Sequence, residues 1–459
     1  MKVLFYASSS NEYDSQNIER LRSPQMAQEW IELASLHPEH NFFIVTQLPS
    51  PFLVDTNSDC IGIEQNLCPN LCQKILAQTS PEEFAKQILA FEPDFCIAAS
   101  FWITPFDWLP VNDAMIAEKL EEEGIKTFCH PAESAFISFD KVRTHLFLEQ
   151  NGFFVPKAVY INHLEYWCER PHKEIKCNVY KNYSLAKISK MNFPVIIKDT
   201  VGLSSYSMEV AVSYKQALAY LNSGRSSTDR IVEEFMQGIQ FGTEIYGFPG
   251  NYIVMPPFMF SVNKYGITSP KQCIKLGPIT SPSFRLNELN QMLLTLAEKM
   301  NLRGVAQVDL VFTKDGWRII EINPRLSGMS ETYAISLRTS LPNLLYQIAS
   351  AEFSKKTFTL ETKNLLPTLN LKLPILTKEQ FNRISSIPFV KCARQIFNKI
   401  AKQEREKGYC EIIFSSEESS ASFADLEAKL DYLYKEFPES TEADFLETAK
   451  SMIALVKEK

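Results

Sequence analysis

Long apolar runs and an excess of basic charge are both missing from this sequence of 459 residues. No stretch approaches the length of a membrane-spanning helix, which takes about 20 apolar residues. The opening MKVLFYA is apolar, but polar SSSNEYD follows at once, so it predicts a first strand and is too short for a signal peptide. We therefore expect a cytoplasmic protein that makes no contact with a membrane.

Zinc-ligand spacings are also missing. The ten cysteines are scattered, and free thiols in a reducing cytoplasm are the simplest interpretation. Cys68 and Cys72 are spaced i,i+4 on a predicted helix, but no neighbouring pair completes a site, so we interpret them as packing residues. Cys168, His172 and Cys177 have no credible ligand spacing either.

The balance of charges is ordinary for a globular enzyme. The chain is 45% hydrophobic and 22% charged, with a net charge of -7 that argues against nonspecific binding to nucleic acid. Its length predicts roughly two to four domains. No G-x-G-x-x-G follows the first strand, so a dinucleotide site has no support.

The first part of the chain alternates predicted strands and helices. Such alternation favours a parallel sheet with helices on its faces. The predicted strands are residues 2–7, 41–47 and 94–100, and the predicted helices are residues 23–37, 81–91 and 112–123.

The most informative stretch is residues 305–330, VAQVDLVFTKDGWRIIEINPRLSGMS. It predicts two strands joined by a K-D-G turn, which brings Asp309 close to Glu321. Two adjacent carboxylates repel each other, and a divalent cation makes the arrangement tolerable. Asn323 adds a neutral oxygen on the face of Glu321, and Arg325 suits an anionic substrate or intermediate. An isolated D…E-x-N is more often an exposed hairpin, so the interpretation needs nucleotide-binding residues elsewhere.

Phosphate-binding residues are predicted upstream. Lys198 ends a strand before a loop that contains Gly202, Ser204 and Ser205, an arrangement in which an ammonium and backbone N–H groups can hold phosphate oxygens. Lys141 lies in the first turn of a predicted helix that begins at Asp140 and ends near Gly152. A lysine there is more often simply solvated.

Residues 230–246, RIVEEFMQGIQFGTEIY, combine apolar side chains with a few polar groups, as a small-molecule slot requires. Glu244 follows on an outgoing strand, where we expect a structural role.

These pieces together resemble the ATP-grasp superfamily. The motif D-x11-E-I-N-P-R, from Asp309 to Arg325, looks like the family's metal-binding hairpin, with the nearest patterns in biotin carboxylase-like and D-alanine–D-alanine ligase-like members. Lys141, Lys198 and Glu233 occur in the family's order within residues 128–345. The loop after Lys198 departs from the pattern, because biotin carboxylases carry several glycines where this chain has one glycine and several serines.

The resemblance implies roles for individual residues. Asp309, Glu321 and Asn323 would hold two Mg2+ ions, which Mn2+ could replace, and Lys275 would lie beside the transferred phosphate, with Lys264 and Lys271 left open. Arg325 and backbone N–H groups around Gly328, in a small-residue loop over 326–330, would stabilise an acylphosphate. The phosphates of ATP would contact Lys141 and Lys198, and its adenine amino group would contact Glu233. The purine edge would meet the backbone of Glu234, Phe235 and Met236, and the ribose would lie near Gln240.

The resemblance also implies a domain plan. It consists of a pre-ATP-grasp α/β domain over 1–127 with a parallel sheet, an ATP-grasp domain of two α+β subdomains over 128–365, and a small C-terminal α/β domain over 366–459. The flap subdomain would span about 190–236, and residues 157–190 look like an insertion. In the first domain, Ser8, Ser9, Ser10 and Arg22 could serve the acceptor pocket, although the serines more often only shape a turn. In the last, we predict strands at 367–373, 390–393 and 409–414 and helices at 378–384 and 420–436.

The function implied is an ATP-dependent carboxylate–amine ligase that forms an amide through an acylphosphate and releases ADP and phosphate. Its partners would be a small-molecule carboxylate and an amino acid-like amine, and a homodimer is left open. Two alternatives remain. A carboxylase would act through carboxyphosphate, although the chain has no biotinyl M-K-M segment, and a nucleotide sensor would bind ATP without an acceptor.

Overall fold

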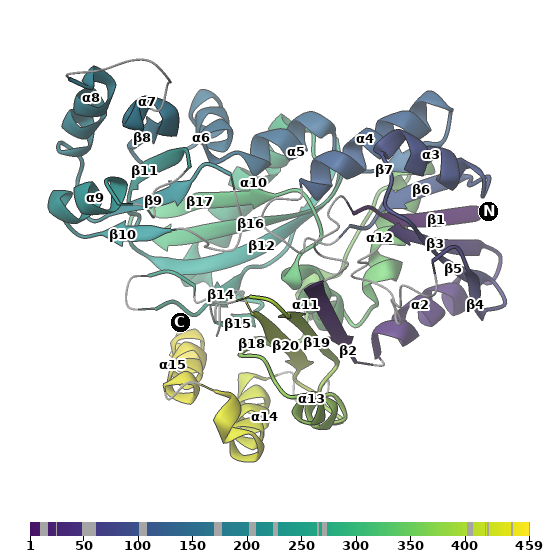
Figure 1. Ribbon diagram of the computed structural model, residues 1–459. Coiled ribbons are helices and arrows are strands. Elements are labelled where there is room, and N and C mark those ends of the chain that lie inside the picture. The colour runs from purple at the N-terminus through teal and green to yellow at the C-terminus, as the bar shows by residue number, and fades with distance from the viewer. Residues whose placement is uncertain are drawn as a thin grey trace.

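The computed structural model describes residues 1–9, 17–23, 25–47, 61–100, 108–168, 177–201, 208–223, 228–263, 266–268, 273–401, 407–417, 419, 422–441 and 444–458. Three sheets organise these residues (Figure 1). One belongs to the N-terminal part, a small one stands apart at the opposite end of the molecule, and a large one lies between them.

The N-terminal sheet has six strands in the order β4-β5-β3-β1-β6-β7. Neighbouring strands are parallel except for β4 and β5, so the predicted parallel sheet is confirmed. Alternate residues of β1 pack on opposite faces: Val3 and Phe5 lie with Trp30, whereas Leu4 and Tyr6 lie in a second cluster. The strands are β1 (Lys2–Ala7), β3 (Asn41–Gln47), β4 (Glu64–Cys68), β5 (Leu71–Leu76), β6 (Phe95–Ala98) and β7 (Lys126–Phe128), and the helices are α2 (Gln25–Leu36), α3 (Pro81–Leu89) and α4 (Leu109–Glu122).

The helix predicted to carry Cys68 and Cys72 is wrong. Cys68 ends β4 and Cys72 lies in β5, with a two-residue turn at Pro69 and Asn70 between the strands. Asn70 fixes this turn, because its side-chain amide donates to the carbonyl oxygens of Ala34 and His40 at 2.9 Å each. The i,i+4 spacing therefore spans a hairpin turn. The nine cysteines within the described residues are free thiols, as predicted.

The small sheet has four antiparallel strands in the order β10-β9-β11-β8. Since β8 lies at its edge and pairs with β11, the described residues between 157 and 190 belong to this subdomain, and the predicted insertion is wrong for them. Charged and aromatic side chains pair here, because the ammonium of Lys181 lies 4.6 Å from the ring centre of buried Tyr166 and 4.9 Å from that of Trp167. The elements are β8 (Ala158–Ile161), α7 (His163–Trp167), α8 (Val179–Ile188), β9 (Val195–Asp199), β10 (Glu209–Ala211), α9 (Tyr214–Leu221) and β11 (Arg230–Glu234).

The large sheet has ten strands and runs without a break in the order β17-β16-β12-β14-β15-β18-β20-β19-β2, with β13 paired to β12. Strand β15 lies before the predicted boundary at residue 365 and β18 lies after it, yet the two strands pair in one sheet. The predicted domain boundaries therefore stay a prediction. The strands are β2 (Ile18–Arg22), β12 (Ile239–Phe248), β13 (Asn251–Val254), β14 (Phe258–Phe260), β15 (Cys273–Gly277), β16 (Gly304–Thr313), β17 (Gly316–Asn323), β18 (Thr368–Leu373), β19 (Cys392–Asn398) and β20 (Gly408–Ser415).

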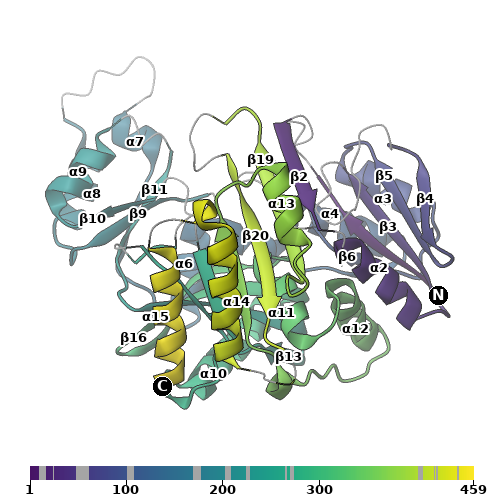
Figure 2. The same cartoon turned by 90° about the horizontal axis from the view of Figure 1, so that it is seen from below.

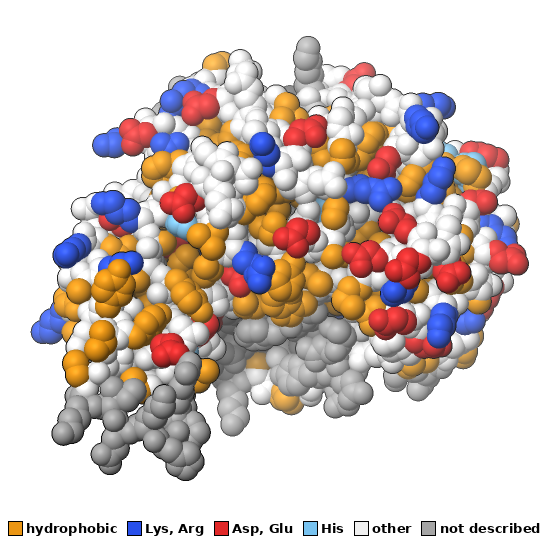
Figure 3. Space-filling model, turned by 90° about the horizontal axis from the view of Figure 1, so that it is seen from above, with side chains coloured by type: hydrophobic (Ala, Val, Ile, Leu, Met, Phe, Trp, Pro, Cys, Tyr) orange, Lys and Arg blue, Asp and Glu red, His pale blue; other side chains and the backbone are white. Residues whose placement is uncertain are grey.

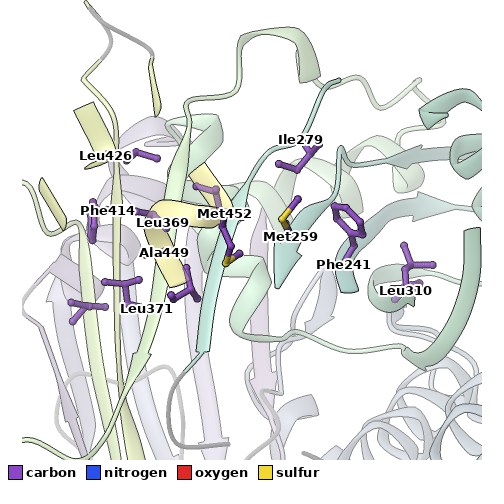
Figure 4. Close-up of a cluster of buried hydrophobic side chains, with 14 of the residues drawn as sticks. Phe241, Met259, Ile279, Leu310, Leu369, Leu371, Phe414, Leu426, Ala449 and Met452 are labelled. Carbon is purple, nitrogen blue, oxygen red and sulfur yellow. The ribbon is translucent and has the colours of Figure 1, made fainter. Parts of the chain in front are cut away.

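Helices cover both faces of the large sheet. The C-terminal helices α14 and α15 lie against β18 and β20 (Figure 2). Leu369, Leu371 and Phe414 of these strands meet Leu426 and Met452 of the helices in one continuous core, which also includes side chains of β12, β14 and β16 (Figure 4). The helices are α5 (Ala132–Phe139), α6 (Lys141–Gln150), α10 (Leu286–Met300), α11 (Gly328–Leu337), α12 (Leu341–Phe353), α13 (Lys378–Ser385), α14 (Phe423–Glu436) and α15 (Phe445–Glu458).

Strand β2 was not predicted. It comes from the N-terminal part of the chain but pairs with β19, so Arg22 lies opposite Arg394 on the large sheet. Ser8 and Ser9 instead follow β1 of the six-stranded sheet, so Arg22 belongs to a different sheet, and a shared role in the acceptor pocket stays a prediction.

The surface carries charges of both signs. On the face that bears α3 to α6, acidic and basic side chains are interspersed with apolar ones (Figure 3). Among the described residues, no helix has both the length and the apolar character needed to cross a bilayer.

Candidate functional site

The predicted hairpin is present. Asp309 on β16 and Glu321 on β17 are direct cross-strand partners, and Gln307 pairs with Asn323 one alternation away. The opposite face of β16 is apolar, because Val308 and Leu310 are fully buried in the core. The amide of Gln307 donates to an oxygen of Asp309 at 2.8 Å and fixes the orientation of this carboxylate.

The electrostatics of the hairpin fit a divalent cation. Burial, together with the nearby charge of Glu321, raises the pKa of Asp309 to about 7. A cation would relieve both the desolvation and the repulsion. Within the described residues, no group of three or more His, Cys, Asp or Glu side chains is arranged around a metal position. The donors here are two carboxylates and the Asn323 amide, which leaves coordination positions for phosphate oxygens, as Mg2+ requires.

Lys198, at the end of β9, is held by Glu233 of β11. Its ammonium lies 2.7 Å from one carboxylate oxygen of Glu233, and a ring nitrogen of His145 lies 3.3 Å from the other. Burial alone would raise the pKa of Glu233, but Lys198 and His145 outweigh it and lower the pKa to about 2. Lys141 begins α6, where burial lowers the pKa of its ammonium although the charge of Glu321 opposes the shift.

The side chains and backbone groups at the end of β11 are arranged differently from the predicted adenine contacts. Both oxygens of Glu233 are already engaged, and the carboxylate of Glu234 accepts from the backbone and side-chain nitrogens of Asn192 at 2.9 and 3.1 Å. The backbone N–H groups of Glu234 and Phe235 donate to other carbonyls. Among the described residues, the N–H of Met236 makes no hydrogen bond, so it is the group left to meet a purine edge.

Gln240 organises the neighbouring segment. Its amide nitrogen donates to the carbonyl of Gly266 at 2.6 Å, and its oxygen accepts from the hydroxyl of Thr268 at 3.0 Å. The slot beside Gln240 has apolar walls, made by Ile196, Met208, Phe235, Met236, Phe260 and Ile267.

Arg325, Lys275 and Gly328 lie on the other side of the hairpin. The guanidinium of Arg325 donates to the side-chain oxygen of Asn323 at 3.0 Å. The ammonium of Lys275 lies 3.9 Å from the carboxylate of Glu411. A Cβ at position 328 would come within 2.9 Å of a Glu411 oxygen, so a larger residue here would displace the carboxylate of Glu411.

The small-residue loop predicted over 326–330 is shorter than expected, because α11 already begins at Gly328. Ser327 and Ser330 form a capping box at this helix start, and both hydroxyls also donate to the buried carboxylate of Glu244, at 3.0 and 2.7 Å. Burial raises the pKa of Glu244 to about 7, although these hydroxyls and that of Tyr246 favour its charged form. Glu244 thus anchors the start of α11 beside the hairpin.

One cavity of about 260 Å3 brings these residues together. Every described candidate for nucleotide binding, metal binding or stabilisation of the acylphosphate lines it: Lys141, Lys198, Glu233, Glu234, Phe235, Met236, Gln240, Lys275, Asp309, Glu321, Asn323, Arg325 and Gly328. Gly202, Ser204, Ser205, Lys264 and Lys271 lie outside the described residues. The lining also includes Lys372, Tyr409 and Glu411, which the sequence did not single out. They lie on predicted strands, but nothing local indicated that these strands border the cavity.

Ser8 and Ser9 do not line the main cavity. The hydroxyls of Ser8 and Ser100 donate to the same oxygen of buried Asp113, at 2.5 and 2.8 Å. The N–H of Ser9 donates to the side-chain oxygen of Gln47 at 3.0 Å, so both serines shape the end of the sheet. Ser10 lies outside the described residues. A second cavity, of about 30 Å3, separates Asp113 from Arg325.

Comparison with known families agrees with this geometry. Residues 138–329 match the ATP-grasp domain family, and the match contains the hairpin, Lys141, Lys198 and Glu233. Residues 138–329 are therefore an ATP-grasp domain.

Curated relatives are more distant in sequence. A carbamoyl-phosphate synthase of Methanobrevibacter smithii is 24% identical over 169 residues, which cover 36% of this chain and 45% of that protein. The large chain of carbamoyl phosphate synthase from Pseudothermotoga lettingae is 22% identical over 279 residues, which cover 60% of this chain and 23% of that one. The chain thus spans less than half the length of these relatives.

Solved structures share the fold over nearly the whole chain. N5-carboxyaminoimidazole ribonucleotide synthetase from Thermus thermophilus superimposes with a TM-score of 0.60 at 14% identity and covers 95% of this chain and 98% of its own. L-amino acid ligase from Bacillus licheniformis gives 0.60 at 15% identity, covering 96% and 97%. Biotin carboxylase from Campylobacter jejuni gives 0.58 at 12% identity, covering 97% and 96%. The predicted fold class is therefore confirmed.

Proposed function

We propose that the protein is an ATP-dependent carboxylate–amine ligase, which forms an amide through an acylphosphate and releases ADP and phosphate. The observation that carries the proposal is the single cavity in which the Asp309–Glu321 pair, the cations Lys198, Lys275 and Arg325, and an apolar slot face one another. Phosphoryl transfer depends mainly on positioning and charge neutralisation, and these groups provide both.

ATP would bind with its adenine between the apolar walls and its purine edge at the N–H of Met236. Lys198 would contact the α- or β-phosphate, held in direction by its ion pair with Glu233. Lys141 and Lys275 would offset further negative charge along the triphosphate. The low exposure of the Lys198 and Glu233 side chains, 11% and 12%, strengthens such charge-assisted contacts.

Asp309, Glu321 and Asn323 would hold Mg2+, with two ions in the arrangement that the family resemblance implies. When bound, the metal neutralises phosphate charge and aligns the phosphate oxygens. The protein's part is to keep the three donors in register across one hairpin, with Gln307 orienting Asp309 and Arg325 orienting Asn323.

The reaction would proceed in two displacements. An oxygen of the substrate carboxylate attacks the γ-phosphorus, the bond from this phosphorus to the bridging oxygen breaks, and ADP leaves. The amine then attacks the acyl carbon, the bond from that carbon to the phosphate oxygen breaks, and phosphate leaves while the nitrogen loses a proton. Arg325 and the N–H groups at the start of α11 would stabilise the negative charge of both stages.

A carboxylase is the second candidate. It is supported by structural relatives whose names describe N5-carboxyaminoimidazole ribonucleotide synthetase and biotin carboxylase. In that reaction bicarbonate would take the place of the carboxylic acid. A nucleotide sensor is the third candidate, and it would leave the acceptor side of the cavity without a role.

The decisive experiment measures ADP release with pooled carboxylic acids and amino acids, with and without bicarbonate, and repeats it with hydroxylamine. A ligase releases ADP only when an acid is present and yields a hydroxamate from the activated carboxylate. Bicarbonate-dependent ADP release without any hydroxamate would identify a carboxylase. ATP binding without turnover under every condition would leave the sensor. Glu321→Gln serves as the control for contaminating ATPase.

A further inference from the structure

A row of charged side chains crosses the large sheet at the edge of the main cavity. Lys372 of β18 is the cross-strand partner of Glu411 of β20, and Glu411 is the partner of Arg394 of β19. Lys275 of β15 lies diagonally from Lys372, because it pairs with Asn370. Diagonal neighbours on adjacent strands lie about 7–8 Å apart.

Strand alternation directs these side chains toward the cavity. Leu371 and Leu373 on β18, and Cys410 and Ile412 on β20, face the core beneath α14 and α15. The residues between them therefore face α11 and the cavity, which Lys372, Tyr409 and Glu411 line.

Both carboxylate oxygens of Glu411 already accept hydrogen bonds from neighbouring side chains. The guanidinium of Arg394 donates to one of its oxygens at 2.6 Å, and the amide of Asn370 donates to the other at 2.9 Å. Although burial would raise the pKa of Glu411, Arg394 and Lys275 lower it, so the group is a carboxylate. Arg394 matches its single negative charge, and Lys275, at 3.9 Å, is only a distant partner.

Lys372 is a half-buried cation that faces an aromatic ring. Its ammonium lies 3.8 Å from the ring centre of Tyr409, and within the part of the chain that the structure describes it forms no ion pair. Burial and the neighbouring Lys275 lower its pKa to about 8. Arg394 already matches the charge of Glu411, so Lys372 adds positive charge to this wall of the cavity without an ion pair of its own among the described residues. A second negative group is the complement that such a wall lacks.

We propose that Lys372 and Tyr409, together with Lys275, bind a second carboxylate of the acid substrate, and that the preferred acid is therefore a short dicarboxylate. The inference rests on the proposed ligase function. Lys275 lies between the hairpin and Lys372, because its charge influences the pKa of Asp309 on one side and that of Lys372 on the other. One carboxylate would react beside Arg325 and Lys275, and the other would lie between Lys275 and Lys372, about one strand spacing further from the hairpin.

The first test measures binding of chain-matched acids to the protein saturated with Mg2+ and a non-hydrolysable ATP analogue. Calorimetry compares succinate with butyrate, glutarate with valerate, and adipate with hexanoate. At least one dicarboxylate should bind tenfold or more tightly than its monocarboxylate. Lys372→Met should abolish that preference and leave the monocarboxylate within about twofold, whereas Lys372→Arg should keep most of it. Lys378→Met, at an exposed lysine of α13, is the matched control.

A second pair of variants tests the ring. Tyr409→Phe should keep the preference, and Tyr409→Leu should weaken it by several-fold, because only the leucine removes the ring beneath the ammonium. Unchanged affinity for the ATP analogue in all variants shows that the cavity is intact.

The outcomes separate the two proposals. If no dicarboxylate is preferred, or if Lys372→Met weakens both acids equally, the subsite is refuted. Hydroxamate formation from monocarboxylates alone would refute the subsite and leave the ligase standing. A dicarboxylate preference that depends on Lys372, but without ADP release with any acid and amine, would support the subsite and refute the ligase.

Discussion

The ammonium of Lys198 and the carboxylate of Glu233 lie 2.7 Å apart on neighbouring antiparallel strands. A lysine at a strand end has several rotamers open to it, and this ion pair selects one of them. The contact also explains why Glu233, which we predicted at the adenine, is turned toward Lys198. Glu233 is thus a positioning residue for Lys198, and the pair is the natural starting point for mutagenesis.

Lys198→Met should weaken binding of magnesium-ATP tenfold or more, because it removes a charge-assisted contact worth roughly 1.5–3 kcal/mol. Glu233→Gln should weaken it less, since the ammonium remains but loses its fixed direction. Calorimetry measures both affinities. Lys190→Met, at an exposed lysine that follows α8, is the control. If folded Lys198→Met binds ATP with unchanged affinity, the assignment of Lys198 to nucleotide binding is wrong.

Glu321→Gln preserves the shape of the hairpin but removes one of its two cross-strand carboxylates. Magnesium-ATP should bind poorly, and turnover should fall by several orders of magnitude. Asp315→Asn, in the exposed turn of the same hairpin, should leave both values unchanged. The affinity is measured at several Mg2+ concentrations, and near-normal turnover of Glu321→Gln would contradict the metal assignment.

Arg325→Lys keeps a positive charge but loses the planar fork that donates to Asn323. We expect kcat to fall much more than ATP affinity, because the lost interaction belongs to the acyl-transfer stage. Steady-state kinetics and calorimetry on the same sample give the two numbers. Arg318→Lys is the matched control, because Arg318 lies on β17, just before Arg325 in the chain, and packs over the ring of Phe154. Equal losses in affinity and kcat would place Arg325 in nucleotide binding instead.

Glu244 predicts a pH dependence of stability. Its pKa in the folded protein, about 7, lies above its ordinary value of 4.5, mainly because of burial. The folded protein therefore holds a proton between these values that the unfolded chain has released. The stability contributed by this proton is complete below about pH 4.5 and is lost as the pH rises through 7, at a cost of about 3 kcal/mol.

Glu244→Gln should remove this dependence, so the variant should lose less stability than the parent between pH 5 and pH 7.5, as followed by urea denaturation. Glu447→Gln, at an exposed position of α15, should follow the parent. Identical pH profiles for the parent and Glu244→Gln would show that the buried carboxylate is stabilised fully by its three hydroxyl partners.

The hairpin could be predicted from sequence because its information is local. Asp309 and Glu321 are separated by one turn, and alternation assigns each side chain to a face. The same holds for Lys198, whose strand and following loop are adjacent in sequence. The six-stranded sheet was predictable in its parallel character, since strands and helices alternate along the chain.

Other features depend on pairings that no local pattern encodes. Lys372 and Tyr409 reach the cavity only because β18 pairs with β15, which lies far upstream in the sequence. His145 meets Glu233 because α6 packs beside β11, and the residue separation is 88. The sequence did not predict the turn at Pro69 and Asn70, because two cysteines on either side of a hairpin turn can have the same i,i+4 spacing as two cysteines on a helix. Each of these failures concerns which elements become neighbours.

The pairing of β2 with β19 has a consequence for biosynthesis. The hydrogen bond between Ser23 and Ala393 spans 370 positions, and at ribosomal speeds of about 5–20 residues per second β2 emerges roughly 20–70 s before its partner. All six strands of the N-terminal sheet can assemble in that interval, while β2 still presents an open edge to other nascent chains. We therefore expect the capture of β2 to be a late event of co-translational folding and the step most exposed to aggregation. A chaperone that shields a single edge strand would act at this point.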